Sequence, residues 1–213
     1  NKDKKVKGLK MNKNALFKIS YGLYVLTSKD GDKHSGCIIN TAMQISETPL
    51  RVCISINKAN YTHDLVMKSK KFNVSSLSQE ADFDTFKHFG FQSGRDVDKF
   101  AGYDSYKISE NGLAYVTKGT NAFISAEVEE TLDSGSHTLF IAKVTDAEIL
   151  SDVPSTTYDY YQSNIKPKPE KPAESDKTVW VCKVCGYKYE GEELPEDYIC
   201  PLCKHPASDF EKM

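Results

Sequence analysis

The chain has 213 residues, of which 39% are hydrophobic and 27% charged, a globular composition with room for one ordinary domain and a small one. The formal net charge of −2 argues against a general nucleic-acid-binding protein. The sequence contains no run of about eighteen apolar residues, the length that would predict a membrane span. No secretory signal pattern is present, so we expect a cytoplasmic protein.

The first ten residues, NKDKKVKGLK, carry five lysines and one aspartate and show no apolar periodicity. We interpret residues 1–10 as a disordered basic tail, with Met11 a candidate for the natural start. The alternative interpretation is a basic arm that binds an acidic partner.

Residues 11–162 predict a domain built mainly of strands. The expected elements of the first half are a short helix at NALFKISYG, a hairpin at LYVLTSKDGDKHSGCIIN, a strand at LRVCISIN, a helix at YTHDLVMKS, a strand at KFNVSSL and a helix at DFDTFKHFG. The second half predicts strands within YKISENGLAYVTKG, then two long strands of AFISAEVEETLDSGSHTLFIAKVTDAEIL joined by the DSGS turn. This order predicts an antiparallel barrel, closed or partly closed, with a few helices. No G-x-G-x-x-G pattern occurs, which argues against a Rossmann nucleotide fold.

The segment SNIKPKPEKPAESDK is rich in proline and charge and has almost no apolar side chain. We interpret residues 163–176 as a semi-rigid, extended linker. It separates the larger domain from residues 177–213, a piece too small to be stabilised by a hydrophobic core alone.

Four cysteines in this small piece form two C-x-x-C pairs, Cys182/Cys185 and Cys200/Cys203. Four thiolates suit a tetrahedral site for Zn²⁺ or a single iron ion, and the spacing alone favours zinc. The small piece therefore predicts a metal centre that supports its fold. The isolated Cys37 and Cys53 stand in apolar, strand-like surroundings and are expected to be buried.

The aromatic residues around these cysteines shift the expectation to iron. The segment VWVCKVCGYKYEG, followed by LPEDYICPLC and DF, closely resembles rubredoxin. The resemblance implies one iron ion held by Cys182, Cys185, Cys200 and Cys203, with zinc as a substitute in recombinant material. The short spacer between Cys185 and Cys200 resembles the rubredoxin modules appended to larger redox proteins, and Lys204 stands where that family often has glycine.

The larger domain has a resemblance of its own. FKISYGLYVLTSKDGDKHSGCIINTAMQIS, ISINKANYTHDLV, KFNVSSL, DKFAGY and SHTLFIAKV look like the flavin-reductase-like, FMN-binding split-barrel family. With the rubredoxin-like piece, the combination resembles the high-molecular-weight rubredoxins of anaerobic bacteria. This resemblance implies a split β-barrel, bound FMN, a homodimer, an NAD(P)H-dependent reductase as electron donor and a flavodiiron protein as acceptor.

Two segments are candidates for the FMN site. SINKANYTHD lies at the end of a strand and the start of a helix, where backbone N–H groups favour a phosphate. By resemblance it is the phosphate site, and INTAMQIS lies along the flavin ring. The candidate residues are Asn40, Thr41, Met43, Gln44, Ser55, Asn57, Lys58, Tyr61, Thr62 and His63. The alternative is that some of these residues only form a turn and cap a helix.

His137 follows the DSGS turn and begins a long strand. A histidine in this position is usually a surface or hydrogen-bonded residue, whereas the resemblance implies a place near the flavin or its substrate. We treat His137 as the candidate catalytic residue.

Three functions follow from this interpretation. The first is an electron-transfer protein that passes electrons through FMN and the Fe(Cys)₄ centre. The second is an enzyme that oxidises NAD(P)H directly and uses the iron as an internal acceptor. The third is a zinc-ribbon interaction module on a flavin-binding scaffold, with no electron flow to the metal.

Overall fold

The computed structural model describes residues 12–167, 178–201 and 205–212. We call residues 12–167 the barrel domain and the described residues from 178 onward the cysteine module. The barrel domain begins with η1 (Lys13–Lys18), β1 (Tyr24–Asp30), β2 (Lys33–Ile39), β3 (Ala42–Glu47), β4 (Leu50–Asn57), α1 (Tyr61–Ser69), β5 (Lys71–Leu77) and α2 (Phe83–Gly90). It continues with β6 (Tyr106–Ile108), β7 (Ala114–Val116), β8 (Thr120–Asp133), β9 (His137–Ile149), α3 (Tyr158–Tyr160) and η2 (Tyr161–Ile165). The cysteine module contains β10 (Val179–Cys182), β11 (Lys188–Glu190), η3 (Ala207–Asp209) and β12 (Phe210–Lys212).

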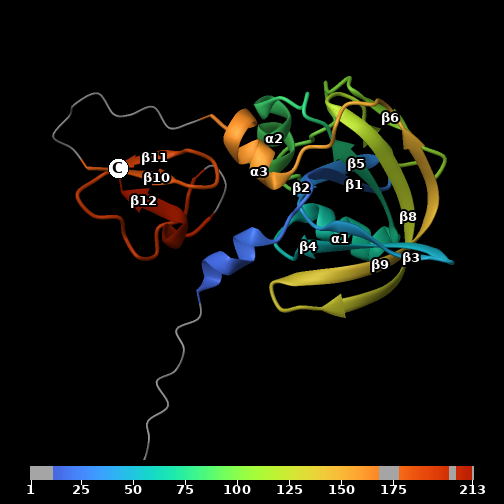
Figure 1. The fold of residues 1–213 in the computed structure, drawn as a ribbon, viewed down its shortest axis with the longest axis horizontal. Helices are drawn as coiled ribbons and strands as arrows, with labels where there is room; N and C mark the ends of the chain where they lie inside the picture. The colour runs from blue at the N-terminus through green and yellow to red at the C-terminus, as the bar shows by residue number, and fades with distance from the viewer. Residues whose placement is uncertain (1–11, 168–177, 202–204, 213) are drawn as a thin grey trace, which may run out of the picture.

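Seven strands of the barrel domain form one sheet in the order β2-β1-β5-β8-β9-β4-β3, and every pairing in it is antiparallel. The β1–β2 hairpin turns at Gly31, whose φ of 57° is a left-handed conformation that glycine adopts without strain. The mainly β, antiparallel fold expected from the sequence is confirmed. Figure 1 shows the barrel domain on one side and the cysteine module on the other.

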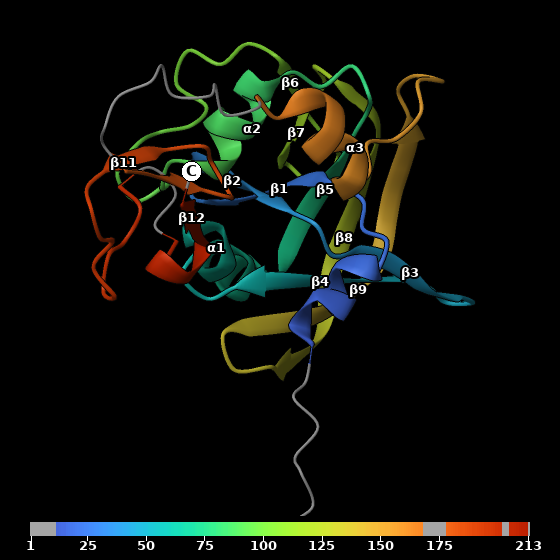
Figure 2. The ribbon, with the colours of Figure 1, turned by 60° about the vertical axis from the view of Figure 1, so that its left-hand side comes forward.

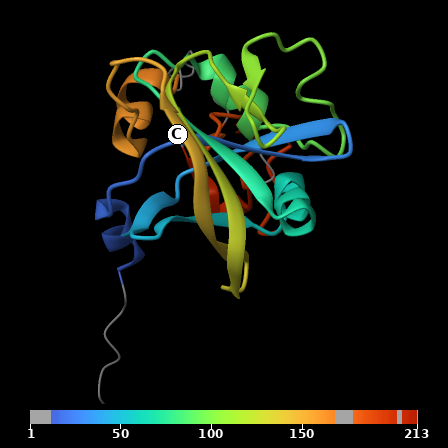
Figure 3. The same cartoon turned by 90° about the vertical axis from the view of Figure 1, so that its right-hand side faces the viewer.

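The order of the strands requires the sheet to curve. β2 and β3 are its two outer strands, yet only Asn40 and Thr41 separate them in the chain. Seven strands laid flat would hold the outer strands about 29 Å apart, whereas this connection reaches only about 11 Å. The sheet therefore wraps around its own core, which is the barrel seen in Figure 3.

The interior of the barrel domain contains two apolar clusters. The first fills the curved sheet and includes the fully buried Phe72 and Phe140. The second lies beneath α2 and includes Phe86, Phe89 and Tyr161. Each large side chain fully buried in this way contributes about 1.5–3 kcal/mol relative to an exposed one.

The two longest helices are short and amphipathic. α1 has nine residues and buries Leu65 and Val66 against the sheet. α2 has eight residues and buries Phe86 and Phe89 in the second cluster. In the ranges that the structure describes, no helix combines the length and the apolar character needed to cross a membrane.

A buried lysine fastens the chain after α2 to the sheet. The ammonium group of Lys99 donates hydrogen bonds to the carbonyl oxygens of Gly36, 2.7 Å away, and Phe89, 2.8 Å away. Only 3% of the residue is exposed, and burial lowers its pKa to about 8. The cation thus joins β2 to the end of α2 without a carboxylate partner in the described contacts.

The cysteine module contains a three-stranded sheet in the order β11-β10-β12. Its own cluster gathers Phe210, Cys182 and Cys200 with partly buried Trp180 and Tyr198, and the Tyr189 and Tyr198 rings lie 4.7 Å apart. The apolar clusters of the two units share no residue. Each unit therefore has a core of its own.

In the barrel domain, most predicted elements occur within a residue or two of the expected positions, and two segments, β3 and α3–η2, were not predicted. β3 is mostly exposed, so its alternation of side chains did not mark it as a strand. The α3–η2 segment runs to Ile165, into the range interpreted as linker. The boundaries of the predicted tail, domains and linker stay predictions, because residues 1–11 and 168–177 lie outside the described ranges.

Asp82 provides a test of the local interactions that begin α2. Its Oδ1 atom accepts hydrogen bonds from the Thr85 backbone N–H at 2.9 Å and from the Thr85 hydroxyl at 2.8 Å, and Oδ2 pairs with Lys118 at 2.7 Å. We expect Asp82→Ala to lower the free energy of unfolding by about 1–2 kcal/mol at neutral pH. Denaturant titrations followed by circular dichroism measure this loss.

The same residue has a defined pH dependence. The hydrogen bond with Lys118, together with the helix cap, lowers the pKa of Asp82 from 3.8 to about 2. A carboxylate with a lowered folded-state pKa stabilises the protein above its unfolded-state pKa and loses this effect as pH falls through the folded-state value. The difference between wild type and Asp82→Ala should therefore shrink from about pH 4 to pH 2. An equal difference at both ends of that range would contradict the assignment.

Candidate functional site

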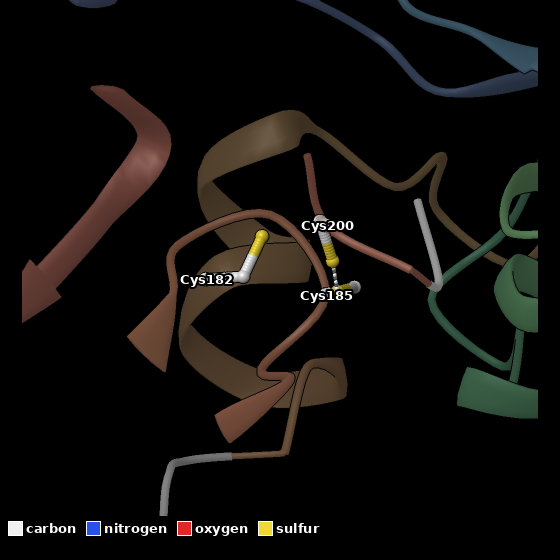
Figure 4. Close-up of side chains that lie close together, drawn as sticks. All are labelled: Cys182, Cys185 and Cys200. Atoms are coloured by element: carbon white, nitrogen blue, oxygen red, sulfur yellow. Dashed lines mark hydrogen bonds between the residues drawn. The ribbon is translucent and has the colours of Figure 1, made fainter. Parts of the chain in front are cut away.

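Three cysteines converge in the cysteine module. Cys182 ends β10, Cys185 follows it in the next turn, and Cys200 comes from the opposite side of the module. Their sulfur atoms all lie within 4.8 Å of one another, and those of Cys185 and Cys200 are 3.4 Å apart (Figure 4). Cys182 and Cys200 are fully buried, and Cys185 is half-buried.

Backbone hydrogen bonds shape the turn that carries the first cysteine pair. The Gly186 N–H donates to the Cys182 carbonyl at 2.8 Å, and the Cys182 N–H donates to the Tyr187 carbonyl at 2.9 Å. Gly186 has φ of 78°, the left-handed conformation expected for the residue after a C-x-x-C pair. At the third cysteine, the Cys200 N–H donates a hydrogen bond to the His205 carbonyl at 2.8 Å.

This arrangement fits a tetrahedral metal ion. Metal–sulfur bonds of about 2.3 Å place tetrahedral sulfur ligands about 3.8 Å apart, close to the separations found here. Cys203, the fourth predicted ligand, lies outside the described residues. The sulfur donors suit iron or zinc, and buried Phe210 and several partly buried aromatic residues pack around the ligands.

The barrel domain has a cavity of about 350 Å³ in its curved sheet, within the range of ligand pockets. Met43 and Gln44, two predicted flavin-ring residues, lie in its wall. Tyr24 and Ser76 also line it, although sequence patterns gave no signal for them because each looks like an ordinary strand residue. The complete lining is Tyr24, Ala42, Met43, Gln44, Leu50, Val52, Ile54, Val74, Ser76, Ile124, Val144 and Ala147.

The two predicted flavin segments meet where the outer strands come together. The Ser55 N–H donates to the Thr41 carbonyl at 3.3 Å, and the Thr41 hydroxyl donates to the Asn40 side chain at 3.1 Å. Asn40 is exposed and Thr41 is half-exposed at this junction. From Val52, beside the cavity, β4 runs about 16 Å to Asn57, so one elongated ligand can contact both segments.

Asn57 and Lys58 stand at the far end of β4, directly beside the start of β9. Asn57 is paired with His137 across the strands, and its side chain accepts a hydrogen bond from the Ala59 N–H. The Lys58 ammonium group contacts both carboxylate oxygens of Asp133 at 2.8 Å. An anion bound by Lys58 would therefore compete with Asp133, a partner that lies 75 residues away and that sequence patterns did not indicate.

Tyr61 begins α1 between two cations. Lys33 and Arg95 lie 5.2 and 5.3 Å from the centre of its ring, on segments before and after α1 in the chain. Arg95 also pairs with Asp64 at 2.6 Å, and this hydrogen bond, with that of His63, lowers the pKa of Asp64. The start of α1 is thus surrounded by side chains that already have partners.

Thr62 and His63 point into the protein. Thr62 is 1% exposed, and its side chain is hydrogen-bonded with the buried Cys37, whose pKa burial raises to about 11. The His63 Nε2 atom lies 2.9 Å from the Thr138 hydroxyl, and Nδ1 lies 3.2 Å from Asp64. These contacts leave the backbone of this turn, rather than the Thr62 hydroxyl, as the group available to an anion.

The predicted catalytic residue, His137, is half-exposed at the beginning of β9. Its Nδ1 atom lies 2.9 Å from the Ser136 hydroxyl. The structure therefore places His137 with Asn57 and Lys58 at one end of the β4–β9 pair. The flavin-site residues and the role of His137 stay predictions.

Two domain families match the chain. Residues 16–169 match the flavin reductase like domain, and residues 180–211 match the rubrerythrin, rubredoxin-like domain. The high molecular weight rubredoxin of Moorella thermoacetica is 36% identical over 230 residues, covering 95% of this chain and 100% of that protein. The NAD(P)H ferric-chelate reductase of Archaeoglobus fulgidus is 37% identical over 163 residues, covering 76% of this chain and 96% of that protein.

Solved structures share the fold of the barrel domain. An NADH:FAD oxidoreductase of Streptomyces globisporus superposes with a TM-score of 0.60 at 23% identity, covering 68% of this chain and 84% of that one. An FMN-binding protein of Thermus thermophilus superposes with a TM-score of 0.57 at 23% identity, covering 62% and 72% of the two chains. These likenesses confirm the split-barrel architecture.

The convergence of the cysteines predicts that Cys182→Ser disrupts metal binding without unfolding the barrel domain. Removal of one buried thiolate leaves an incomplete site, whereas the barrel clusters contain none of the module's residues. Elemental analysis should show most of the metal lost, and circular dichroism should still show a cooperative barrel transition. Cys53→Ala, which removes a buried cysteine of the barrel, is the matched control and should keep the metal. Full metal content in Cys182→Ser would disprove the ligand assignment.

Proposed function

We propose that this chain, which belongs to the high-molecular-weight rubredoxins, is an electron carrier. In this proposal it passes electrons from an NAD(P)H-dependent reductase through FMN and iron to a flavodiiron terminal reductase. The flavin-reductase-like domain and the rubredoxin-like domain make the chain a redox protein of the flavin and iron type. The observation that carries the proposal is the convergent, largely buried cysteine set on the same chain as a flavin-reductase fold.

The donor set supports electron transfer rather than substrate chemistry at the metal. When bound, FMN supplies two-electron exchange and iron supplies one-electron exchange, so the pair can convert one into the other. Cys182, Cys185 and Cys200, with Cys203 as the proposed fourth ligand, would hold the iron. A site filled by four thiolates leaves no position for a substrate, and Cys182 and Cys200 are themselves fully buried.

The proposed FMN site extends along β3 and β4. The cavity beside Met43 and Gln44 supports a place for the apolar ring, because ligand pockets are mostly apolar with a few polar groups. The junction at Asn40, Thr41 and Ser55 and the turn from Asn57 to His63 offer the polar groups for the rest of the ligand.

An exposed apolar face supports a homodimer. Met43 and Ile45 of β3 and Leu50 of β4 are apolar, yet their exposed fractions are 56%, 44% and 43%. Exposed apolar residues gathered on neighbouring strands are typical of an association surface, and we propose a second copy of the chain as the partner.

The second candidate function is direct oxidation of NAD(P)H by the barrel domain. It is favoured by the 37% identity with a protein named ferric-chelate reductase (NAD(P)H), which matches 76% of this chain. Under this alternative the iron is an internal acceptor and no separate reductase is needed.

Anaerobic mixing separates the two functions. The chain loaded with FMN and iron is mixed with NADH, and the visible absorbance of the iron centre is followed. As an electron carrier, the protein should keep its colour until a nicotinamide-dependent reductase is added, and a flavodiiron protein with its oxidant should restore the colour. Rapid bleaching by NADH alone would instead establish the direct reductase. The chain loaded with FMN and zinc is the control, because its absorbance changes on mixing with NADH come from the flavin alone.

The ion pair at the end of β4 gives a test of the phosphate site. We expect Lys58→Met to weaken FMN binding about tenfold, roughly 1.4 kcal/mol, because a charged donor is lost. Asp133→Asn is the informative partner variant, since it removes the carboxylate that holds Lys58 and should tighten FMN binding. Both are measured by quenching of flavin fluorescence. Unchanged affinity in the two variants would place the phosphate elsewhere.

A further inference from the structure

We propose that Lys166 and the helical segment before it form a docking surface for the cysteine module, and that the charge of Lys166 raises the reduction potential of the iron bound there. The part about the potential rests on the proposed function, because it requires iron in the cysteine site. The docking part holds for any metal in that site.

The first observation is a direct contact with the turn that carries the cysteines. The Lys166 ammonium group donates a hydrogen bond to the carbonyl oxygen of Lys183. Lys183 lies between Cys182 and Cys185, and its own N–H donates to the Asp209 carbonyl at 2.7 Å. Lys166 therefore binds the backbone of the ligand turn itself.

The second observation is a shared cavity of about 240 Å³ between the two units. Figure 4 shows the helical ribbon of α3 and η2 behind the labelled cysteines, and Figure 2 shows the module from another side. The residues that line the cavity are Gln162, Lys166 and Pro167 of the barrel domain and Val181, Cys182, Lys183, Gly186 and Glu211 of the cysteine module.

The third observation is that the segment carrying Lys166 is anchored in the barrel core. The Tyr158 N–H donates to the Tyr21 carbonyl at 2.8 Å, and the Lys166 N–H donates to the Tyr161 carbonyl at 2.8 Å. Tyr161 is 6% exposed, and its ring lies 4.4 Å from that of Phe86. Lys166 is thus held by a packed helical segment rather than by a free chain end.

One of the predicted metal ligands lies at this contact between the two units. Cys182 lines the cavity that the module shares with Gln162 and Lys166 of the barrel domain. Electrons from the barrel domain would reach the metal through this side.

Coulomb's law gives the direction of the effect on the potential. Ferric iron with four thiolates has a net charge of −1, and one electron from a donor converts it to a ferrous site of charge −2 with no proton or ligand exchanged. A nearby cation stabilises the more negative state more strongly, particularly where water is partly excluded. Charge and hydrogen bonding near the cluster are recognised determinants of such potentials. Lys166 should therefore favour the reduced iron.

The variant Lys166→Met tests the charge while keeping much of the side chain's length. In the FMN- and iron-loaded chain, spectroelectrochemistry should give a more negative iron potential, with the ratio of reduced to oxidised iron at fixed potential falling about two- to tenfold. Lys166→Arg should retain most of the wild-type potential. The matched control is Lys107→Met on exposed β6, which Figure 1 places on the side of the barrel away from the module, and it should leave the potential unchanged.

A second measurement tests docking without electron transfer. In the zinc-loaded chain, the backbone amide NMR signals of Lys183 and Gly186 should shift in Lys166→Met and stay in place in Lys107→Met. Unchanged amide signals would overturn the docking surface, whatever the function of the iron. Shifted signals with an unchanged iron potential would overturn the electrostatic role. If the iron proved not to accept electrons at all, the proposed function would fail, while the amide signals would still decide the docking.

Discussion

The connection from β2 to β3 constrains the rest of the barrel domain. Asn40 and Thr41 must join strands that stand at the two edges of the sheet, so the five strands between them have to carry the curvature. Much of it passes through the long β8–β9 hairpin, whose register shifts between Ser125 and Ala126 and again between Val128 and Glu130. Such bulges bend a strand and increase its twist. The hairpin thereby pairs with β5 on one side and β4 on the other.

Curvature also determines which polar groups come together. Closure brings Thr41 beside Ser55, and the β4–β9 register brings Asn57 beside His137. The proposed flavin face is therefore assembled from segments that are distant in the chain, and its rigidity depends on the sheet rather than on the loops that carry some of its residues. Lys58 is the exception, because its ion pair with Asp133 has to open before its charge is available to a ligand. The ion pair therefore keeps the Lys58 ammonium group near the proposed ligand site, and Asp133 balances its charge while no ligand is bound.

Local patterns in the sequence were sufficient for most strands, for both longer helices and for the cysteine cluster, because each depends on nearby residues. The C-x-x-C spacing and Gly186 specify the turn that positions Cys182 and Cys185, and no distant contact is needed to infer it. Strand β3 was missed because Met43 and Ile45 remain exposed, so burial does not impose the usual alternation. The burial of the Thr62 side chain against Cys37 depends on how α1 packs on β2, which no local pattern encodes.

The two units differ in what stabilises them, and this difference bears on how they can be joined. The barrel domain has two extensive apolar clusters, whereas the described part of the cysteine module has one small cluster built around its cysteines. We therefore expect metal binding and folding to be coupled in the module but not in the barrel. A large apolar interface between them would make the module's fold depend on the barrel as well. The contact observed here instead includes a hydrogen bond from Lys166 to a backbone carbonyl, beside a cavity lined by both polar and apolar residues. Contacts of this kind are readily reversible, which suits the proposed function, in which the module would receive electrons on one side and deliver them to another protein.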